Sequence, residues 1–483
     1  MVNHVIIEFK KAFCSIKFIF TLFIGFICLC VGGVDDIAGN FTVPIGSLYL
    51  FAQSYSSGFY SIFLFLAPLI CSIPYALSYI EDYENGEYKR NIDTIGNLKY
   101  FVIKFCVNGI VGGLSLALII IFYYICILMI KGVNPNDIMN FDFNNSLTTL
   151  INKNQHLYIL VESIFSFIFG FTFANITLSI SIFTRDKWIT LSTPIFFHVL
   201  SFVVLSNITP YLDSLIIYSF FRNSSMNILP RIIYTLFINI SCILVSIFFI
   251  RKNYIGTEKN IRLYKLSISF FIIILIKFQF QDFLELYNYN ERSLFSFLLF
   301  LFNNLYIFHY FISFCFIIFI SNILKKDTET INNNIKTLFV KNIKKIVSII
   351  LKFLIFFIIS SILIYIFNKD IKITNNRFYS DILLIIFSII LMTLYLFTIS
   401  LICITTNSIF KSQILSIVII SFIIVFNISI YIGDFNNIKP FSIVYNSLFS
   451  SYTNSNYIIP IIFWILLIAI ISNIYLNYSK TID

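Results

Sequence analysis

The stretch YIEDYENGEYKRNIDTIGNLKYFVIKF, residues 79–105, interrupts one of the most apolar parts of the chain. It carries several acidic and basic side chains and an Asn-Gly turn, whereas the segments on either side hold almost no charge. A charged passage between two long apolar runs is typical of a loop that joins two membrane-spanning helices, each about 20 residues long. The flanking runs therefore decide the fold class, and the side of the membrane that the passage faces decides what it can bind.

Composition extends this interpretation to the whole chain. Of its 483 residues 59% are hydrophobic and only 12% are charged, whereas about 25% are charged in a soluble protein. We predict an all-α polytopic membrane protein with about twelve transmembrane helices. The expected spans are 18–34, 59–79, 102–130, 157–183, 188–206, 231–250, 266–281, 294–323, 346–367, 382–405, 413–433 and 457–476. The excess of Phe and Tyr is what AT-rich codons specify, so it does not by itself indicate aromatic binding sites.

The basic residues indicate which side of the membrane each loop occupies. Segment 35–58 contains two Asp and no Lys or Arg, while segment 251–265 contains five basic residues. Because Lys and Arg gather in cytoplasmic loops, this asymmetry predicts that both termini and the passage at 79–105 are cytoplasmic. It also explains the net charge of +10 without a nucleic-acid partner. We expect a multi-pass protein of the bacterial cytoplasmic (inner) membrane.

The segment before the first span, residues 3–17, has the pattern of a short interfacial helix. Its apolar residues fall on one helical face and its lysines flank that face. The face comprises Val5, Ile6, Phe9, Phe13 and Ile16. The alternative is a plain basic flank.

Paired prolines indicate an internal repeat. Pro210 and Pro440 both end an Asn-Ile-X-Pro sequence, and Pro230 and Pro460 both open the last span of a half. Both pairs are separated by the same offset, since 440 − 210 and 460 − 230 are both 230. We therefore predict two six-helix units of the same orientation, residues 1–257 and 258–483.

Each predicted unit has a charged passage between its second and third helices, at 80–101 and at 324–345. In the first, apolar residues at helical spacing predict a helix over 87–100. In the second, an apolar stripe that includes Leu338 and Phe339 is edged by lysines. A short amphipathic helix at the membrane surface, placed twice, would be a docking device; the alternative is a solvated loop held by lipid headgroups.

At this point the chain resembles the ABC-2 type permeases of ABC transporters. The resemblance rests on the basic segment Glu8-Phe9-Lys10-Lys11, on six helices per unit, and on a broken external segment at 207–230. It also rests on the charged passage after the second helix, with Glu81, Glu84, Gly86, Lys99 and Lys104.

The resemblance implies that each passage carries a coupling helix that docks on a cytoplasmic ATPase. In the first passage the implied docking residues are Glu81, Glu84, Gly86, Lys89, Arg90, Ile92 and Ile95. In the second they are Lys336, Leu338, Phe339, Lys341 and Lys344. The chain has no GxxxxGK[ST] motif, so ATP and Mg²⁺ would bind to a separate ATPase, expected in two copies, and this chain would hold no catalytic, cofactor or metal site. The implied cargo of this exporter is hydrophobic or amphipathic, such as a small peptide, a bacteriocin or a lipid-like compound.

Two alternatives remain, a secondary transporter and a membrane-embedded transferase, neither with an ATPase partner. A secondary transporter generally needs buried ionisable groups, and the predicted spans hold few charges. Glu162 and Lys277 are expected close enough to span ends to reach the interface. The polar residues expected in mid-membrane are His198, Asn303, Asn304 and His309. We expect them to make interhelical hydrogen bonds, with a substrate path as the alternative.

Overall fold

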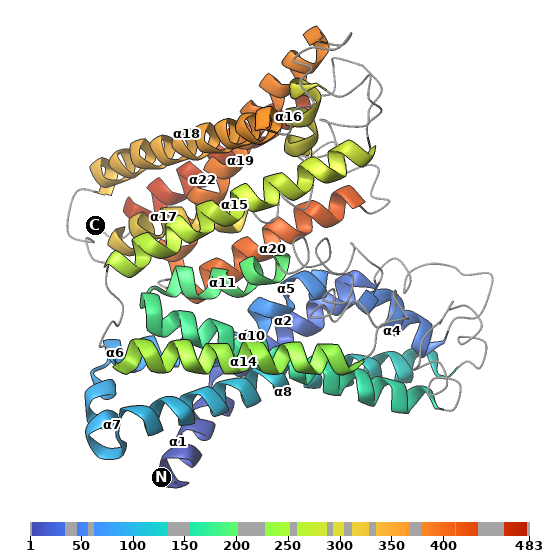
Figure 1. Ribbon diagram of the computed structural model, residues 1–483, viewed down its shortest axis with the longest axis vertical. Coiled ribbons are helices and arrows are strands. Elements are labelled where there is room, and N and C mark those ends of the chain that lie inside the picture. Colours follow the sequence, from blue (N-terminus) through green and yellow to red (C-terminus); the bar gives the residue numbers. More distant parts are fainter. Residues whose placement is uncertain are drawn as a thin grey trace. The chain divides into compact units, whose positions relative to one another are not determined.

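The computed structural model describes residues 2–33, 46–56, 62–133, 154–200, 228–251, 258–286, 293–303, 312–327, 335–367, 378–410, 412–432 and 458–480. Within these ranges every regular element is a helix (Figure 1), as the apolar periodicity predicts. The chain divides into two compact units, Met1–Ile261 and Arg262–Asp483. The sequence places this division after residue 257.

The first unit is built around two long helices that pack along each other, α8 and α10 (Figure 1). Helix α2 and the short helices α1 and α4 pack against α8, and α11 and α14 pack against α10. The helices of this unit are α1 (Val2–Phe13), α2 (Ile16–Gly32), α4 (Ser47–Ser56), α5 (Ile62–Ile70), α6 (Ser78–Glu84), α7 (Glu87–Ile95), α8 (Asn97–Lys131), α10 (Gln155–Thr184), α11 (Lys187–Leu200) and α14 (Ile228–Arg251).

Glycines bring α8 and α10 unusually close. A Cβ atom placed on Gly112 would lie 2.5 Å from the Cβ of Ala174 and 2.7 Å from the carbonyl oxygen of Cys71. A Cβ on Gly170 would lie 2.6 Å from the carbonyl oxygen of Gly112. Real Cβ atoms do not approach other atoms so closely. Small residues at such crossings let helix backbones meet, which is how apolar helices associate where water supplies no driving force.

The second unit is built around α19, which packs against five other helices. Its helices are α15 (Glu258–Leu286, which begins in the first unit), α16 (Leu294–Asn303), α17 (Ser313–Asp327), α18 (Ile335–Phe367), α19 (Phe378–Phe410), α20 (Gln413–Ile432) and α22 (Ile458–Lys480). Aromatic side chains join three of these elements, because the ring of Phe280 lies 5.0 Å from Phe297 and 5.8 Å from Tyr365.

Several helices have the length and composition of membrane spans. Within the described residues four helices qualify singly: Asn97–Lys131, His156–Thr184, Asn342–Phe367 and Ile385–Phe410. The pair Asn3–Phe13 and Ile16–Gly32, bent by 46°, qualifies together. Outward-facing side chains agree with a lipid environment, since Phe237 and Leu244 on α14 are more than half exposed. The total of twelve spans remains a prediction.

The second predicted span, 59–79, is not one regular helix. Helix α5 ends at Ile70, and turns continue the chain to Leu77 before α6 begins. Pro68 and Pro74 lie within this region. Because proline lacks a backbone N–H and its ring clashes with the preceding turn, two prolines six residues apart disfavour an uninterrupted helix.

Candidate docking site at one end of the first unit

The passage at 79–100 forms two short helices, α6 and α7, joined by a turn at Asn85-Gly86. Gly86 has φ +74°, a left-handed conformation that glycine adopts at no steric cost. Gly96 has φ +82° and ψ 152°, a region that is essentially confined to glycine. The prediction of one helix over 87–100 is therefore wrong, because Gly96 ends α7 at Ile95 and α8 begins at Asn97.

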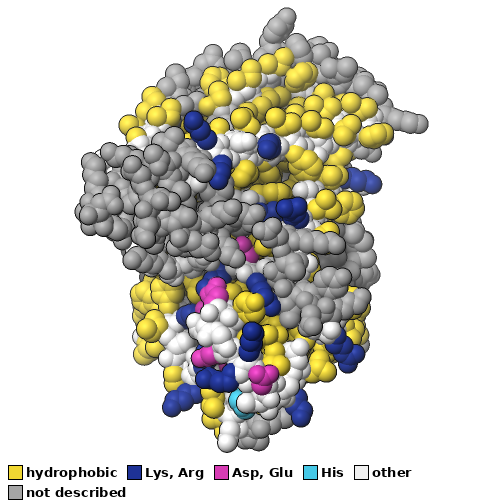
Figure 2. All heavy atoms as spheres, turned by 90° about the vertical axis from the view of Figure 1, so that its left-hand side faces the viewer, with side chains coloured by type: hydrophobic (Ala, Val, Ile, Leu, Met, Phe, Trp, Pro, Cys, Tyr) yellow, Lys and Arg dark blue, Asp and Glu magenta, His cyan; other side chains and the backbone are white. Residues whose placement is uncertain are grey.

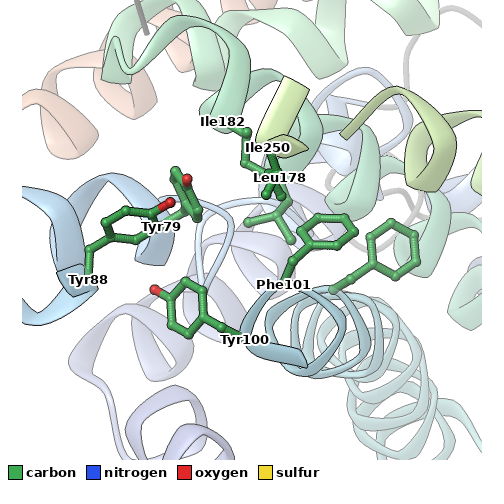
Figure 3. Close-up of a cluster of buried hydrophobic side chains, with 8 residues drawn as sticks. Tyr79, Tyr88, Tyr100, Phe101, Leu178, Ile182 and Ile250 are labelled. Carbon is green, nitrogen blue, oxygen red and sulfur yellow. The ribbon is translucent and has the colours of Figure 1, made fainter. Parts of the chain in front are cut away.

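The apolar face of α7 packs into the protein. Tyr88 is buried in a cluster with Tyr79 and Tyr100, whose ring centroids lie 5.3 Å and 5.8 Å from its own (Figure 3). Ile92 and Ile95 pack against the edge of this cluster. We call it the tyrosine cluster; it comprises Tyr79, Tyr88, Tyr100, Phe101, Phe105, Leu178, Ile182 and Ile250. It joins α7 to α6, α8, α10 and α14, so the apolar stripe of α7 is not available to lipid.

Beside the tyrosine cluster lies a buried group of charges, Glu8, Asp82 and Lys104, which we call the ionic cluster. The Lys104 side chain is fully buried, and its Nζ lies 2.9 Å from Glu8 Oε2 and 2.8 Å from Asp82 Oδ2. Tyr100 donates a hydrogen bond to Asp82 Oδ2 at 2.6 Å, and Tyr75 donates one to Glu8. The ionic cluster therefore joins α1, α6 and α8.

The charges around Asp82 favour its ionised form. Burial alone would raise the pKa of this carboxyl group, but the positive charge of Lys104 opposes that effect. Hydrogen bonds from Lys104, Lys11 and Tyr100 act in the same direction, and together they hold the pKa of Asp82 below its ordinary value of 3.8. Asp82 is thus a carboxylate that the surrounding cations stabilise, although its side chain has no exposure to solvent.

Lys11 extends the ionic cluster toward the surface. Its Nζ lies 2.6 Å from Asp82 Oδ1 and 3.1 Å from Glu87 Oε2, so one lysine of α1 contacts both α6 and α7. Two carboxylates, Glu8 and Asp82, are thereby set against two lysines, Lys104 and Lys11. Both lysines contact Asp82, but the Lys11 side chain is 38% exposed and also pairs with Glu87, so Lys104 is the fully buried cation of the ionic cluster.

Two further ion pairs fasten α6 to neighbouring elements. Lys17 at the start of α2 pairs with Glu81, and Lys187 at the start of α11 pairs with Glu84 at 2.5 Å. The Arg185 guanidinium lies 3.6 Å above the ring of Tyr83, at a distance typical of a cation–π contact. The predicted docking residues Glu81 and Glu84 are therefore engaged within the first unit.

The outward face of α7 is polar throughout. Lys89, Arg90, Asp93 and Thr94 are all exposed. Lys89 and Arg90 form no ion pair with any residue that the structure describes. Figure 2 shows basic and acidic side chains gathered at this end of the first unit, with hydrophobic ones on its flanks. Of the predicted docking residues in this passage, Lys89 and Arg90 thus remain available to a partner, Ile92 and Ile95 face inward, and Gly86 makes the turn.

Four segments that the order of the predicted spans places on the cytoplasmic side meet at this end. They are the N-terminal segment, the passage at 79–100, the α10–α11 junction and the end of α14. Ion pairs join the passage to the N-terminal segment and to the start of α11, the Arg185 contact joins it to the α10–α11 junction, and the tyrosine cluster joins it to the end of α14. Their common location agrees with loops on one side of a membrane. Which side that is remains a prediction.

The predicted apolar face of the N-terminal helix is divided in the structure. Val5, Phe9 and Phe13 pack against a cluster formed by side chains of α8, by Ala12, Phe18 and Tyr75. Ile6 and Ile16 instead point outward, with 59% and 85% of their surface exposed. The prediction of one shared face is wrong for these two residues. Ile16 lies beyond a helix break, because α1 ends at Phe13 and Ser15 begins a new helix by accepting a hydrogen bond from the Phe18 N–H.

The second charged passage is built differently. Its described part is the end of α17 and the first third of α18, a single helix that runs from Ile335 to Phe367 without a break. No glycine occurs between residues 324 and 353, so this passage has no counterpart of Gly96. The expectation of a separate short helix is therefore wrong here. Lys336, Leu338, Phe339 and Lys341 lie in the first two turns of α18, and Lys344 is exposed. At about 1.5 Å per residue, the helix is longer than the roughly 30 Å hydrocarbon core.

Of the predicted mid-membrane polar residues, the structure describes His198 in the first unit and Asn303 in the second. His198 is buried with its ring edge-on to Phe169 and Phe173, at 5.8 Å and 5.7 Å. Its Nδ1 has no hydrogen-bond partner in the part of the chain that the structure describes, so the predicted interhelical bond is not seen at this atom. Asn303 ends α16, whereas Asn304 and His309 lie outside the described residues.

Glu162 lies away from solvent. It is 1% exposed and accepts a hydrogen bond from the Tyr55 hydroxyl at 2.7 Å. The expectation that it reaches the interface is wrong, because α4 packs its tyrosine against this part of α10. The Lys277 side chain is exposed, and its reach to the membrane interface stays a prediction.

The residues that sequence reasoning missed are those that hold α6 and α7 in place. Asp82, Lys11, Arg185 and Lys187 lie in four different elements, and sequence spacing gives no sign that they meet. Lys104 did carry a signal, since a lysine followed by some 25 largely apolar residues requires a partner if it is buried. Its partners come from 96 residues earlier and 22 residues earlier in the chain, given by 104 − 8 and 104 − 82.

Comparison with known proteins adds no family assignment. No protein-family model matches the chain, and neither a curated protein nor a solved structure matches it. Among the described residues, no group of three or more His, Cys, Asp or Glu side chains is placed to hold a metal ion.

Proposed function

We propose that this chain is the membrane-spanning permease subunit of an ATP-driven ABC exporter, with α7 as a docking helix for a separate cytoplasmic ATPase. One observation carries the proposal: α7 is fastened to the rest of the first unit on its inner side and presents a polar face on its outer side. A docking helix must transmit force to the membrane helices, and a loosely attached loop cannot do so.

The attachments of the hairpin formed by α6 and α7 support this role. Ion pairs link it to α1, α2 and α11, and the tyrosine cluster links it to α8, α10 and α14. A push on α7 would therefore reach most of the long helices of the first unit together. Packed elements transmit such displacements because protein interiors are close-packed and hardly compressible.

The two units differ in ways that favour unequal roles. In the first unit Gly96 separates a short docking helix from the long α8, whereas α18 in the second unit is continuous. We propose that both passages face the ATPases and that the first makes the specific contact. The cargo that we propose is hydrophobic or amphipathic, in keeping with the apolar composition.

The ionic cluster could instead suggest an ion-coupled carrier, because such proteins use buried ionisable groups to couple the movement of an ion to that of the cargo. The contacts within that cluster favour a structural role. Glu8 and Asp82 share Lys104, and each also accepts a hydrogen bond from a tyrosine hydroxyl, so both carboxylates are already engaged by partners within the chain. A carrier would show cargo movement in vesicles driven by a proton or sodium gradient without ATP.

Co-purification from native membranes tests the proposal. The intact chain should retain a protein with a GxxxxGK[ST] nucleotide-binding motif, identified by mass spectrometry, and the complex should hydrolyse ATP. The variant Lys89→Glu/Arg90→Glu should lose that protein, while Lys131→Glu, at the opposite end of α8, should keep it. If the intact, folded chain retains no ATPase under conditions that preserve membrane complexes, the exporter proposal is wrong.

A further inference from the structure

The charged side chains of residues 79–100 fall into two groups, those that form ion pairs within the chain and those that do not. Residues 79–100 hold five acidic and three basic side chains, a formal charge of 3 − 5 = −2. Four of the five acids form ion pairs with lysines of other elements. The four are Glu81, Asp82, Glu84 and Glu87. The fifth, Asp93, is exposed.

The three basic residues of the same passage behave in the opposite way. Lys89, Arg90 and Lys99 are exposed, and none is paired with a residue in the described part of the chain. Asp93 is subtracted from these three, so the side chains of the passage that have no ion pair carry a net charge of 3 − 1 = +2. Glu84 is exposed as well, but it is paired with Lys187. The passage is acidic in its sequence, whereas its unpaired charges are mainly basic.

We infer that the partner of this surface is a protein whose docking groove is lined with acidic side chains. This inference rests on the docking role proposed for α7 and names the chemistry that the partner must supply. Complementary charge steers two proteins together and sets their register, and like charge in the wrong position is strongly disfavoured. Arg90 can form a bidentate pair with a carboxylate, and Lys89 can add a point charge beside it.

The structure favours a protein over a lipid surface as the occupant. A helix that lies in the membrane interface needs an apolar face to bury among the acyl chains. The apolar residues of α7 instead face the tyrosine cluster: Tyr88 is 9% exposed, and Ile92 and Ile95 pack at its edge. The remaining face, with Lys89, Arg90 and Asp93, has nothing apolar to insert. Anionic headgroups are therefore an outcome to test rather than the occupant that we assign.

Site-specific photocrosslinking in native membranes tests the assignment. A photoreactive phenylalanine analogue is placed at Thr94, which is exposed on α7, and the crosslinked peptide is sequenced by mass spectrometry. We expect a protein peptide that contains clustered Asp or Glu. Crosslinking to phospholipid, or to a peptide without acidic residues, would overturn the inference.

A second experiment reverses the charges of the basic residues on α7. Lys89→Glu/Arg90→Glu should weaken the complex on the order of tenfold or more, and Lys89→Gln/Arg90→Gln should weaken it less. Changing acidic residues of the crosslinked peptide to Lys should restore binding to the first variant. Lys131→Glu is the matched control, and unchanged thermal stability of the variants verifies the fold. Absence of any charge dependence overturns the inference.

The two proposals fail separately. If an ATPase crosslinks to Thr94 and its binding is indifferent to these charge changes, the exporter proposal stands and the acidic groove is wrong. If the crosslinked protein has an acidic docking segment and no nucleotide-binding motif, the acidic groove stands and the exporter proposal is wrong.

Discussion

Removing the charge of Lys104 should strongly destabilise the first unit. The substitution Lys104→Met keeps a long unbranched side chain and removes the ammonium group. Glu8 and Asp82 would then remain buried without the cation that lies 2.9 Å and 2.8 Å from them. Breaking a buried ion pair by removing one partner costs about 3–5 kcal/mol, because an uncompensated charge is left behind.

Thermal unfolding in detergent measures this loss. For a unit of this size 1 kcal/mol corresponds to about 2–4 °C in Tm, so the shift should be on the order of 10 °C. Membrane proteins often unfold irreversibly, so variants must be compared at one scan rate. Lys131→Met is the matched control: it lies on the same helix with an exposed side chain, and its effect should stay within about 0.5 kcal/mol.

A compensated variant separates lost charge balance from lost packing. In Lys104→Met/Glu8→Gln/Asp82→Asn no buried charge is left unpaired, and replacing a whole buried ion group is often close to neutral. This variant should therefore regain much of the stability that Lys104→Met loses. If Lys104→Met unfolds at the same temperature as Lys131→Met, or if the triple variant is worse than the single one, the ionic cluster does not hold the hairpin as described.

Three further predictions concern the backbone, the helix crossing and pH. Gly96→Ala should destabilise the protein by about 1–3 kcal/mol, because φ +82° with ψ 152° is strained for any residue with a Cβ; an unchanged Tm would contradict that backbone geometry. Gly170→Val should prevent correct packing of α8 against α10, because a Cβ at this position would lie 2.6 Å from the Gly112 carbonyl oxygen. Size-exclusion chromatography should then show loss of the monodisperse peak. A normal peak together with an unchanged Tm would rule out so close a crossing. The folded-state pKa of Asp82 lies below its ordinary value of 3.8, so ionised Asp82 stabilises the folded chain fully above about pH 3.8, and this stabilisation is lost as the pH falls below that value. In a plot of Tm against pH, Asp82→Asn should therefore weaken the fall of Tm at acidic pH. An identical fall in the variant would refute the assignment.

Local sequence patterns suffice to identify the class of structure. Long apolar runs leave a bilayer as the one solvent in which this chain can expose so much hydrophobic surface, and helices satisfy the backbone there. The same logic located the passage at 79–105 as a polar interruption and indicated a turn at Asn85-Gly86. These are local properties, because hydropathy over 20 residues and the conformational freedom of glycine do not depend on distant partners.

The role of each side chain in that passage was decided only by tertiary structure. Glu81 and Glu84 look like surface acids in the sequence, yet they pair with Lys17 and Lys187 from other helices. Tyr88 is one of the apolar residues whose helical spacing in the sequence predicts a helix, and the structure shows that it fills a cluster within the protein. Ion pairs and cluster packing join residues tens of positions apart, and periodicity carries no information about such partners. The outward basic face of α7 therefore emerges only after the folded chain has paired its acids internally.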